Sequence, residues 1–243
     1  YDDFNLVSVI QPQFFLRNLR PFVRTLVYVP YFVSFKNWVP QNRLMSAGLD
    51  YADLIPMETE SIRDQYLSVY RNFGEKNNCW ERMAPGQNKF MVLGSPKFDR
   101  VKFPNDEDLR VPAEWEAGLL DANRQKKPAV FYNISVQSLF DRKAAMLDKI
   151  EIVLNTFKAR QDKVALIWRP HPLYRESMFK CCPEGIEKYD RMVAEFRTEK
   201  WGIYDDTSNM YRSMALSDMY YGDGSSVVTL YGMTGKPLMI QTM

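Results

Sequence analysis

Short apolar runs bounded by turn residues alternate with amphipathic stretches along the chain, a pattern typical of strands joined by helices. The alternation is most regular in the second half. It predicts strands at residues 129–133, 164–169, 201–204, 219–222 and 237–241, with helices at residues 142–159, 185–199, 208–215 and 225–233 between them. Because strand and helix alternate throughout, we expect parallel strands with right-handed crossovers and helices on both faces, which is a doubly wound α/β sheet.

The first half carries a weaker form of the same pattern. It predicts strands at residues 6–10, 25–29, 53–57 and 89–93, and a helix over about residues 61–70. The stretch at residues 102–127 is rich in charge and proline, which is typical of a crossing between domains. We therefore expect an incomplete domain at residues 1–109 and a second domain at residues 110–243, with the boundary near Arg110.

Composition narrows the class of protein. The 243 residues are 46% hydrophobic and 26% charged, which excludes a disordered tail, a collagen and a coiled coil. The net charge of +2 provides no overall field for nucleic acid, so no nucleic-acid partner is expected. Three cysteines without CxxC spacing indicate neither a disulfide framework nor a metal site, and favour a reducing compartment such as the cytoplasm. No run approaches the roughly 18 apolar residues of a membrane span. The chain does not begin with Met, so we expect a piece of a longer protein.

The segment Arg169-Pro170-His171-Pro172 follows an expected strand at its carboxyl end, where doubly wound sheets bind ligands. It holds the only histidine of the chain. Prolines on both sides fix φ, so the imidazole and the guanidinium are presented on a stiff turn. Arg offers a planar fork for phosphate, and His donates to a phosphoryl oxygen or moves a proton near neutral pH. The alternative is a proline-bounded turn with a surface arginine and a histidine of no function.

A second candidate site is the sequence Gly222-Asp223-Gly224-Ser225-Ser226, between an expected strand and an expected helix. Glycines let backbone approach a ligand closely, and free N–H groups at a helix start suit a phosphate, as do serine hydroxyls. The alternative is ordinary capping of the helix by Asp223 or Ser225.

Three further segments have simpler interpretations. Asp205-Asp206-Thr207-Ser208 follows another strand, and capping of the next helix explains its composition. Residues 57–61, which include Glu58, are interpreted in the same way. The neighbours Cys181 and Cys182 are expected in a surface loop without a role.

The order of these motifs resembles a known family. Residues 169–172, 205–207, 217–218 with 222–226, and 235–237 are similar in order to the donor-binding domain of the CDP-glycerol glycerophosphotransferases of teichoic-acid assembly. In the first half, residues 53–56, Arg63 with Tyr66, and residues 93–99 resemble the end of the family's acceptor domain. The similarity runs from about Tyr51 to the last residue.

The resemblance implies a GT-B architecture, in which two Rossmann-like domains face each other across a cleft. The implied reaction transfers glycerol phosphate from CDP-glycerol to a hydroxyl of a cell-surface polymer or lipid-linked acceptor and releases CMP. It implies no tightly bound cofactor, leaves the need for a divalent metal open, and places the enzyme in the cytoplasm with peripheral membrane contact through missing parts. Two alternatives stay open: a GT-B glycosyltransferase with another nucleotide-sugar donor, and a catalytically silent nucleotide-binding domain of a polymer-synthesis complex.

The resemblance also implies roles for single residues. His171 is the catalytic residue, and the donor-binding residues are Arg169, Asp223, Gly224, Ser225, Ser226, Asp206, Thr207, Asn133 and Ser135. The chain departs from the family at the acceptor-side His-Gly pair, where it reads Val29-Pro30-Tyr31-Phe32, so Tyr31 is an acceptor-side candidate together with Ser95. It also replaces the family's Pro-Thr loop by Tyr132-Asn133-Ile134-Ser135, so the acceptor and the donor's polyol or sugar can differ. No metal site is expected.

Overall fold

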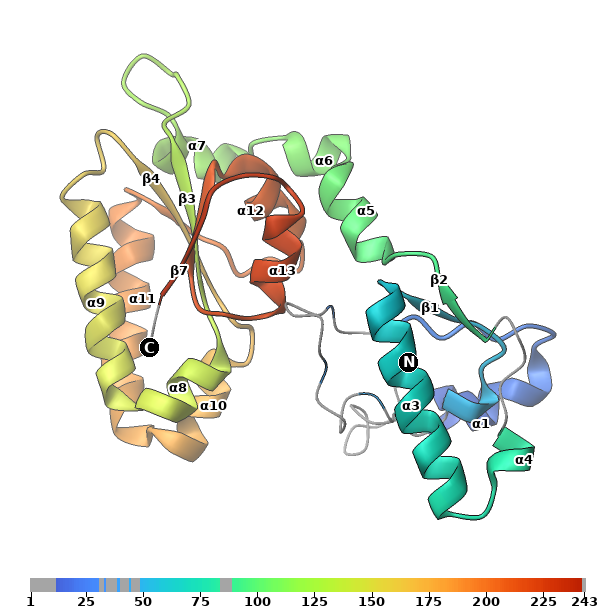
Figure 1. The fold of residues 1–243 in the computed structure, drawn as a ribbon. Helices are drawn as coiled ribbons and strands as arrows, with labels where there is room; N and C mark the ends of the chain where they lie inside the picture. The colour runs from blue at the N-terminus through green and yellow to red at the C-terminus, as the bar shows by residue number, and fades with distance from the viewer. Residues whose placement is uncertain are drawn as a thin grey trace. The chain divides into compact units, whose positions relative to one another are not determined.

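The chain divides into two compact units, Tyr1–Phe98 (unit 1) and Asp99–Met243 (unit 2). The computed structural model in Figure 1 describes residues 12–30, 33, 39, 44, 49–83 and 89–241. The expected strand at residues 6–10 and the acceptor-side candidate Tyr31 lie outside the described residues. Each unit has its own sheet of parallel strands joined by helices, so the predicted α/β class is confirmed.

Unit 1 is built on a small parallel sheet. Strand β1 (Ile55–Met57) pairs with β2 (Phe90–Val92), and a single parallel bridge joins Val27 to Leu54. Helix α3 (Glu60–Lys76) follows β1, and its buried side chains pack in the unit's core with Phe90. Other helices among the described residues of unit 1 include η1 (Pro12–Phe14), α1 (Leu16–Leu19), η2 (Arg20–Phe22), η3 (Leu49–Tyr51) and α4 (Trp80–Met83).

Three short helices follow β2: α5 (Pro96–Lys102), α6 (Asp106–Leu109) and α7 (Ala113–Leu119). The Asp108 side chain, which is fully buried, pairs with Arg100 and accepts from Asn209 Nδ2 at 2.8 Å. The Arg212 guanidinium donates to the Glu107 carboxylate at 3.1 Å. These contacts attach α6 to unit 2. The division between the units therefore falls after Phe98, earlier in the chain than the boundary that the sequence predicts near Arg110.

The sheet of unit 2 has five parallel strands in the order β5-β4-β3-β6-β7. Their bounds are β3 (Ala129–Ile134), β4 (Ala165–Pro170), β5 (Ile203–Tyr204), β6 (Met219–Gly222) and β7 (Leu238–Ile240). Asn133 lies opposite Arg169 on one side and opposite Gly222 on the other. The strand order reverses between β3 and β6, and doubly wound sheets bind ligands outside the carboxyl ends of the strands at that point.

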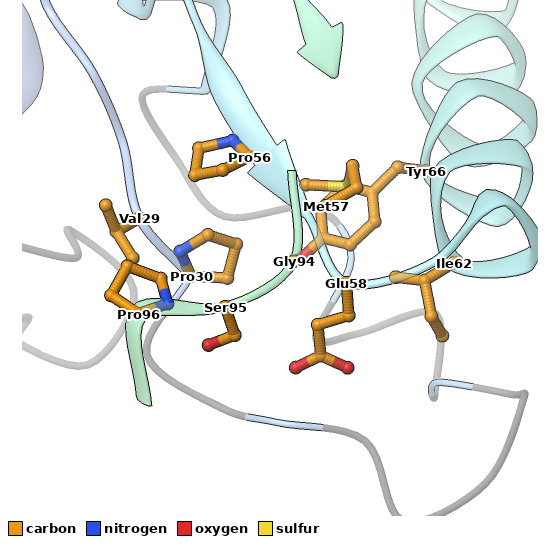
Figure 2. Close-up of a pocket in the computed structure, with 10 residues that line it drawn as sticks. All are labelled: Val29, Pro30, Pro56, Met57, Glu58, Ile62, Tyr66, Gly94, Ser95 and Pro96. Carbon is orange, nitrogen blue, oxygen red and sulfur yellow. The ribbon is translucent and has the colours of Figure 1, made fainter. Parts of the chain in front are cut away.

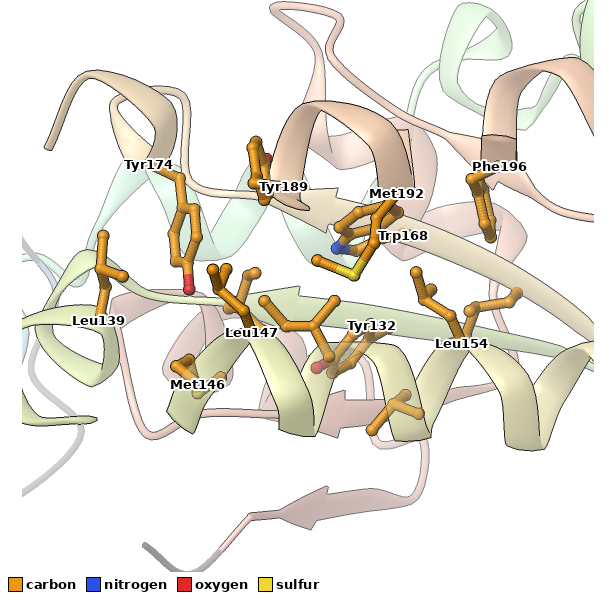
Figure 3. Packing of buried hydrophobic residues seen from close by; sticks show 14 of the residues in the cluster. Tyr132, Leu139, Met146, Leu147, Leu154, Trp168, Tyr174, Tyr189, Met192 and Phe196 are labelled. Atoms are coloured by element: carbon orange, nitrogen blue, oxygen red, sulfur yellow. The ribbon is translucent and has the colours of Figure 1, made fainter. Parts of the chain in front are cut away.

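Helices cover both faces of this sheet, as Figure 1 shows. Helices α9 (Ala144–Lys158) and α11 (Ile186–Glu199) lie on one side, and α12 (Met210–Leu216) and α13 (Ser226–Gly232) on the other. Figure 3 shows Tyr132 and Trp168, from neighbouring strands, packed among side chains of α9 and α11. The centre of the Trp168 ring lies 5.3 Å from the centre of the Phe196 ring and 5.1 Å from the centre of the Tyr204 ring. Such edge-on aromatic contacts add to the stability that burial gives.

The remaining helices of unit 2 follow its first two strands: α8 (Val136–Arg142) after β3, and α10 (Tyr174–Cys181) with η4 (Pro183–Gly185) after β4. All strands and helices predicted for this unit are present, with small shifts at their ends. The helices α8 and α10 were not predicted, nor were α5, α6 and α7 in and before the stretch interpreted as a domain crossing. The expectation of a surface loop at Cys181 and Cys182 is wrong. Cys181 ends α10, and Cys182 is fully buried in the core because it packs behind that helix.

Candidate functional site

The carboxyl ends of β4, β3 and β6 bring several predicted site residues to one edge of the sheet. His171 follows β4, Ser135 follows β3 and Asp223 follows β6. The backbone N–H of His171 donates to the Ile134 carbonyl oxygen at 3.0 Å, which ties this turn to the end of β3. Since neighbouring strands lie about 4.8 Å apart, the ends of β4 and β6 are about 10 Å from each other.

The orientation of the His171 ring follows from one hydrogen bond. Its Nδ1 accepts from the backbone N–H of Leu173 at 3.1 Å, which leaves the proton of the neutral ring on Nε2. Partial burial lowers the pKa of this imidazole below its ordinary value of 6.5. The ring is therefore mainly neutral at pH 7, and its exposed position makes Nε2–H available as a donor.

A buried carboxylate joins the end of β6 to the loop after β3. Asp223 is 1% exposed, and its Oδ2 accepts from the Ser135 backbone N–H at 2.8 Å and from the Ser135 hydroxyl at 3.3 Å. Ser135 also caps α8, because its Oγ accepts from the Ser138 N–H at 3.2 Å. The carboxylate of Asp223 is therefore closed off from solvent and joins the two loops.

The buried atoms of unit 2 that lack a hydrogen-bond partner among the described residues include Asp223 Oδ1 and the hydroxyls of Tyr132 and Tyr174. Burial raises the pKa of the Tyr132 phenol far above its usual range, and the carboxylate of Asp223 raises it further. The same two causes raise the pKa of Tyr174. Both phenols are therefore protonated at neutral pH.

Gly222 lies against β3 where no side chain fits. A Cβ atom at this position would lie 2.1 Å from the Asn133 carbonyl oxygen. Asn133 is 5% exposed, and its Nδ2 donates to the Arg169 carbonyl oxygen at 2.7 Å. Close packing of backbone thus explains the glycine at position 222, and the side chain of Asn133 joins β3 to β4.

Arg169 is held in a buried ion pair. Its Nη1 donates to Asp205 Oδ2 at 2.6 Å and its Nη2 to the Thr207 carbonyl oxygen at 2.7 Å. Asp205, which is 1% exposed, also accepts from Ser213 and from the backbone N–H and hydroxyl of Thr207 at 3.0 and 2.7 Å. These two nitrogens of the guanidinium therefore hold the loop after β5. Sequence analysis gave Asp205 no role of its own, although alternation along β5 places it on the same side as the buried Ile203.

The neighbouring Asp206 is exposed and pairs with Arg197, whose guanidinium lies 4.5 Å from the centre of the Tyr204 ring. The expected cap in this segment is displaced. Helix α12 is capped by Asn209, whose side chain accepts from the Tyr211 N–H at 3.1 Å, because the helix starts two residues later than predicted.

The remaining predicted donor-binding residues lie where α13 begins: Gly224 and Ser225 precede the helix, and Ser226 is its first residue. Gly224 and Ser226 are exposed. Ser225 caps the helix, since its Oγ accepts from the Val227 N–H at 3.2 Å. The structure therefore presents Gly224, Ser226 and His171 at the surface of unit 2. Ser95 belongs to unit 1 and lines a pocket there.

The described residues contain no group of three or more His, Cys, Asp or Glu side chains that could hold a metal ion. In the same part of the chain, no helix is both long and apolar enough to span a bilayer.

No family model matches the sequence, and no curated protein matches it. Among solved structures, the chain is similar to the wall teichoic acid polymerase TagF with CDPG, at a TM-score of 0.47 and 15% identity, over 79% of this chain and 38% of that one. It is also similar to the catalytic domain of starch synthase IV from Arabidopsis thaliana bound to ADP and acarbose, at a TM-score of 0.37 and 12% identity, over 82% of this chain and 40% of that one. The chain thus spans less than half the length of either. At these scores neither likeness carries an argument about function.

Proposed function

We propose that this chain is part of a GT-B-type transferase that takes a nucleoside-diphosphate-linked donor at the carboxyl edge of the unit 2 sheet. The specific donor proposed is CDP-glycerol, whose glycerol phosphate passes to a hydroxyl of a cell-surface polymer or lipid-linked acceptor while CMP leaves. The motif order described above favours this donor, and the function would be carried out at the cytoplasmic face of the membrane.

The observation that carries the proposal is the state of His171. Its Nδ1 is occupied by the Leu173 N–H, so a neutral ring directs Nε2–H outward beside the point where the strand order reverses. That edge is where a doubly wound sheet binds a nucleotide. A hydrogen-bond donor such as this Nε2–H, if it is fixed at that edge before the reaction, stabilises the charge that develops on a phosphoryl oxygen. The protein then does not have to reorient the group during the reaction.

In this proposal the other predicted site residues of unit 2 act around the imidazole of His171. The hydroxyl of Ser226 and the backbone at Gly224 are exposed and suit contact with the diphosphate. Arg169 and Asp223 are positioning residues in this proposal, because each is buried in contacts that fix a loop at the same edge. Asn133 has the same task between β3 and β4.

The single histidine allows a direct test by NMR, since its ring protons give one pair of signals in the full chain. In the free protein we expect the imidazole to titrate with a pKa below 6.5. Addition of CDP should raise that pKa, because a nearby anion favours the protonated ring. A titration that CDP, CDP-glycerol and UDP-glucose all leave unchanged refutes the proposed site. A response to UDP-glucose alone would replace CDP-glycerol by a sugar nucleotide.

Two variants of His171 separate its role in the reaction from its role in the turn. Asn places an amide oxygen near the position of Nδ1 and keeps an acceptor for the Leu173 N–H, whereas Gln places an amide nitrogen near Nε2. We expect His171→Asn to keep the fold and lose about 10²- to 10³-fold in kcat, with His171→Gln retaining more activity. Equal activity of His171→Asn and the unaltered protein in release of CMP rejects the catalytic role.

A further inference from the structure

A pocket lies between α9 and α11, which cover one face of the unit 2 sheet (Figure 1). Its cavity volume is about 60 Å³, whereas that of the unit 1 pocket that Ser95 lines is about 10 Å³ (Figure 2). A cavity of roughly 10–15 Å³ holds one water molecule. The α9–α11 pocket is therefore large enough for a charged head group with a short carbon chain.

The bottom of the α9–α11 pocket is apolar. Leu154 from α9 and Met192 and Phe196 from α11 are buried there, and Figure 3 shows all three between the two helices. The polar lining residues are spaced three or four positions apart on each helix, which places each set on one helix face. They are Glu151, Asn155 and Lys158 on α9, and Glu195 and Glu199 on α11. An apolar bottom with a few polar groups around it is typical of a small-molecule site.

Ion pairs join the two helices on either side of the pocket centre. Nearer the start of the helices, Lys188 Nζ lies 2.6 Å from a carboxylate oxygen of Asp148 and 2.6 Å from one of Glu151. At their carboxyl ends, Lys158 Nζ lies 2.5 Å from Glu199 Oε1. Because the starts of the helices pair with each other and the ends do the same, α9 and α11 run parallel.

Two polar side chains of the lining lie between these ion pairs. The Glu195 carboxylate and the Asn155 amide make no hydrogen bond or ion pair with any residue that the structure describes, and both residues are exposed. Both oxygens of Glu199, in contrast, have partners, since its Oε2 accepts from the Trp201 indole N–H at 3.1 Å. The pocket therefore offers a ligand two oxygen acceptors, one from each helix, and one of them is charged.

The ends of both helices add negative potential at the same place. Helix α9 ends at Lys158 and α11 ends at Glu199, and both residues line the pocket. The last turn of a helix carries the negative end of its dipole, which favours a cation nearby. Because the two helices run parallel, both negative ends act on the same ligand.

The lining selects a cation that donates hydrogen bonds. Three carboxylates against one lysine disfavour an anion. The described residues contain no group of His, Cys, Asp or Glu side chains that could hold a metal ion, so the lining suits a ligand that carries N–H groups. A primary ammonium has three N–H donors, which match the carboxylate of Glu195 and the amide oxygen of Asn155. The apolar bottom of the pocket suits the carbon chain that carries the ammonium.

We propose that the α9–α11 pocket binds a small primary alkylamine in its ammonium form. The ammonium donates to Glu195 and to the side-chain oxygen of Asn155, and its carbon chain packs on Met192 and Phe196.

This pocket is separate from the candidate site for the nucleotide donor. Helix α9 ends shortly before β4 begins, and α11 ends shortly before β5 begins. The pocket therefore lies toward the amino ends of these strands, whereas the nucleotide is proposed to bind at the carboxyl ends. The alkylamine proposal consequently does not depend on the proposed reaction.

Trp201 provides the signal for the test, because its indole N–H donates to Glu199 in the pocket lining. Propylammonium is titrated into the isotope-labelled full chain at neutral pH, and the indole N–H signals are followed by NMR. The Trp201 signal is assigned by its loss in Trp201→Phe. We expect a saturable shift of this signal, while the signal of Trp80 in unit 1 stays in place.

Variants of α11 separate the role of Glu195 from a general effect of charge. Glu195→Gln keeps the shape of the side chain, and we expect it to weaken propylammonium binding about 3- to 10-fold, since this carboxylate is open to solvent. Glu187→Gln removes the same charge from an exposed position of the same helix outside the pocket lining, so its dissociation constant should equal that of the unaltered protein. Glu195→Lys brings its own ammonium to the pocket and should abolish the shift.

Propanol and propionate are the ligand controls, because they have the same carbon chain with no charge or with a negative charge. Neither should move the Trp201 signal at the concentrations used. The proposal is overturned if propylammonium leaves the Trp201 signal unmoved, if propanol moves it equally, or if Glu195→Gln and Glu187→Gln bind propylammonium with equal constants. Binding of Nα-acetyllysine amide without binding of propylammonium would also overturn it, in favour of a lysine side chain from a protein partner.

Discussion

Neutralising Asp205 is expected to destabilise unit 2 far more than neutralising its neighbour Asp206. The two aspartates each pair with an arginine, but side-chain exposure is 10% for Arg169 and 0% for Asp205, against 50% for Arg197 and 60% for Asp206. Asp205→Asn leaves the Arg169 guanidinium buried without its counter-charge, which costs about 3–5 kcal/mol. Asp206→Asn breaks a solvated pair, which contributes at most about 1 kcal/mol.

Hydrogen exchange followed by mass spectrometry suits this test, because peptides from β4 and α12 report on unit 2 alone. At about 1.4 kcal/mol for each factor of ten, a loss of about 3–5 kcal/mol means that Asp205→Asn should raise the opening equilibrium of these peptides by about 100- to 4,000-fold. Adding Arg169→Met to Asp205→Asn should recover part of the loss, since it removes the unpaired charge. Two results would refute this reasoning. One is a loss of stability in Asp205→Asn no larger than that in Asp206→Asn, and the other is a double variant that is less stable than Asp205→Asn alone.

Three further predictions concern the same unit, each checked by urea denaturation monitored by tryptophan fluorescence. Gly222→Ala should lower the free energy of unfolding by about 1–3 kcal/mol or more, because its Cβ would lie 2.1 Å from the Asn133 carbonyl oxygen. Gly224→Ala is the control, since the nearest atom to its Cβ, on Ile240, lies at 3.9 Å. Equal losses of stability in the two variants would contradict the close packing at Gly222. Tyr132→Phe removes a buried hydroxyl that lacks a partner, so stability should be unchanged or higher, and a loss above about 1 kcal/mol would reveal a partner. Lys236→Met should cost about 1–3 kcal/mol, because Nζ donates to three carbonyl oxygens at the end of α12 at 2.6 to 2.9 Å; no loss would show that solvent replaces these hydrogen bonds.

The parallel sheet of unit 2 could be predicted because β3 and β4 each begin with four apolar or aromatic residues, so a single sequence shows them directly. Helix α10 was missed because Pro172 breaks the pattern before it, although Tyr174 and Met178 have helical spacing and are both buried. Alternation along β5 was a usable signal for the burial of Asp205. No local signal distinguishes a guanidinium that binds phosphate from one that holds a loop. The sequence therefore predicted Arg169 as a donor-binding residue, whereas in the structure its guanidinium binds Asp205 and Thr207.

Contacts between residues far apart in the sequence could not be predicted for the candidate site either. The hydrogen bond between Ser135 and Asp223 joins residues 88 positions apart, so only the fold brings them together. The sequence predicts a helix start within residues 57–61, and the structure confirms it with Thr59 as the N-cap. Nothing in the sequence distinguishes Glu58 from its neighbours, although its side chain lines a pocket of unit 1.

The close contact between Gly222 and β3 bears on how this protein could be redesigned. Where the edge of a sheet is closely packed backbone, with a buried carboxylate and a buried amide holding neighbouring segments, mutagenesis libraries that vary those positions will mostly return misfolded variants. Diversity directed instead to the exposed residues Gly224, Ser226 and Gln137 leaves that packing intact. Libraries of this protein should therefore yield folded variants mainly with changes at these exposed positions.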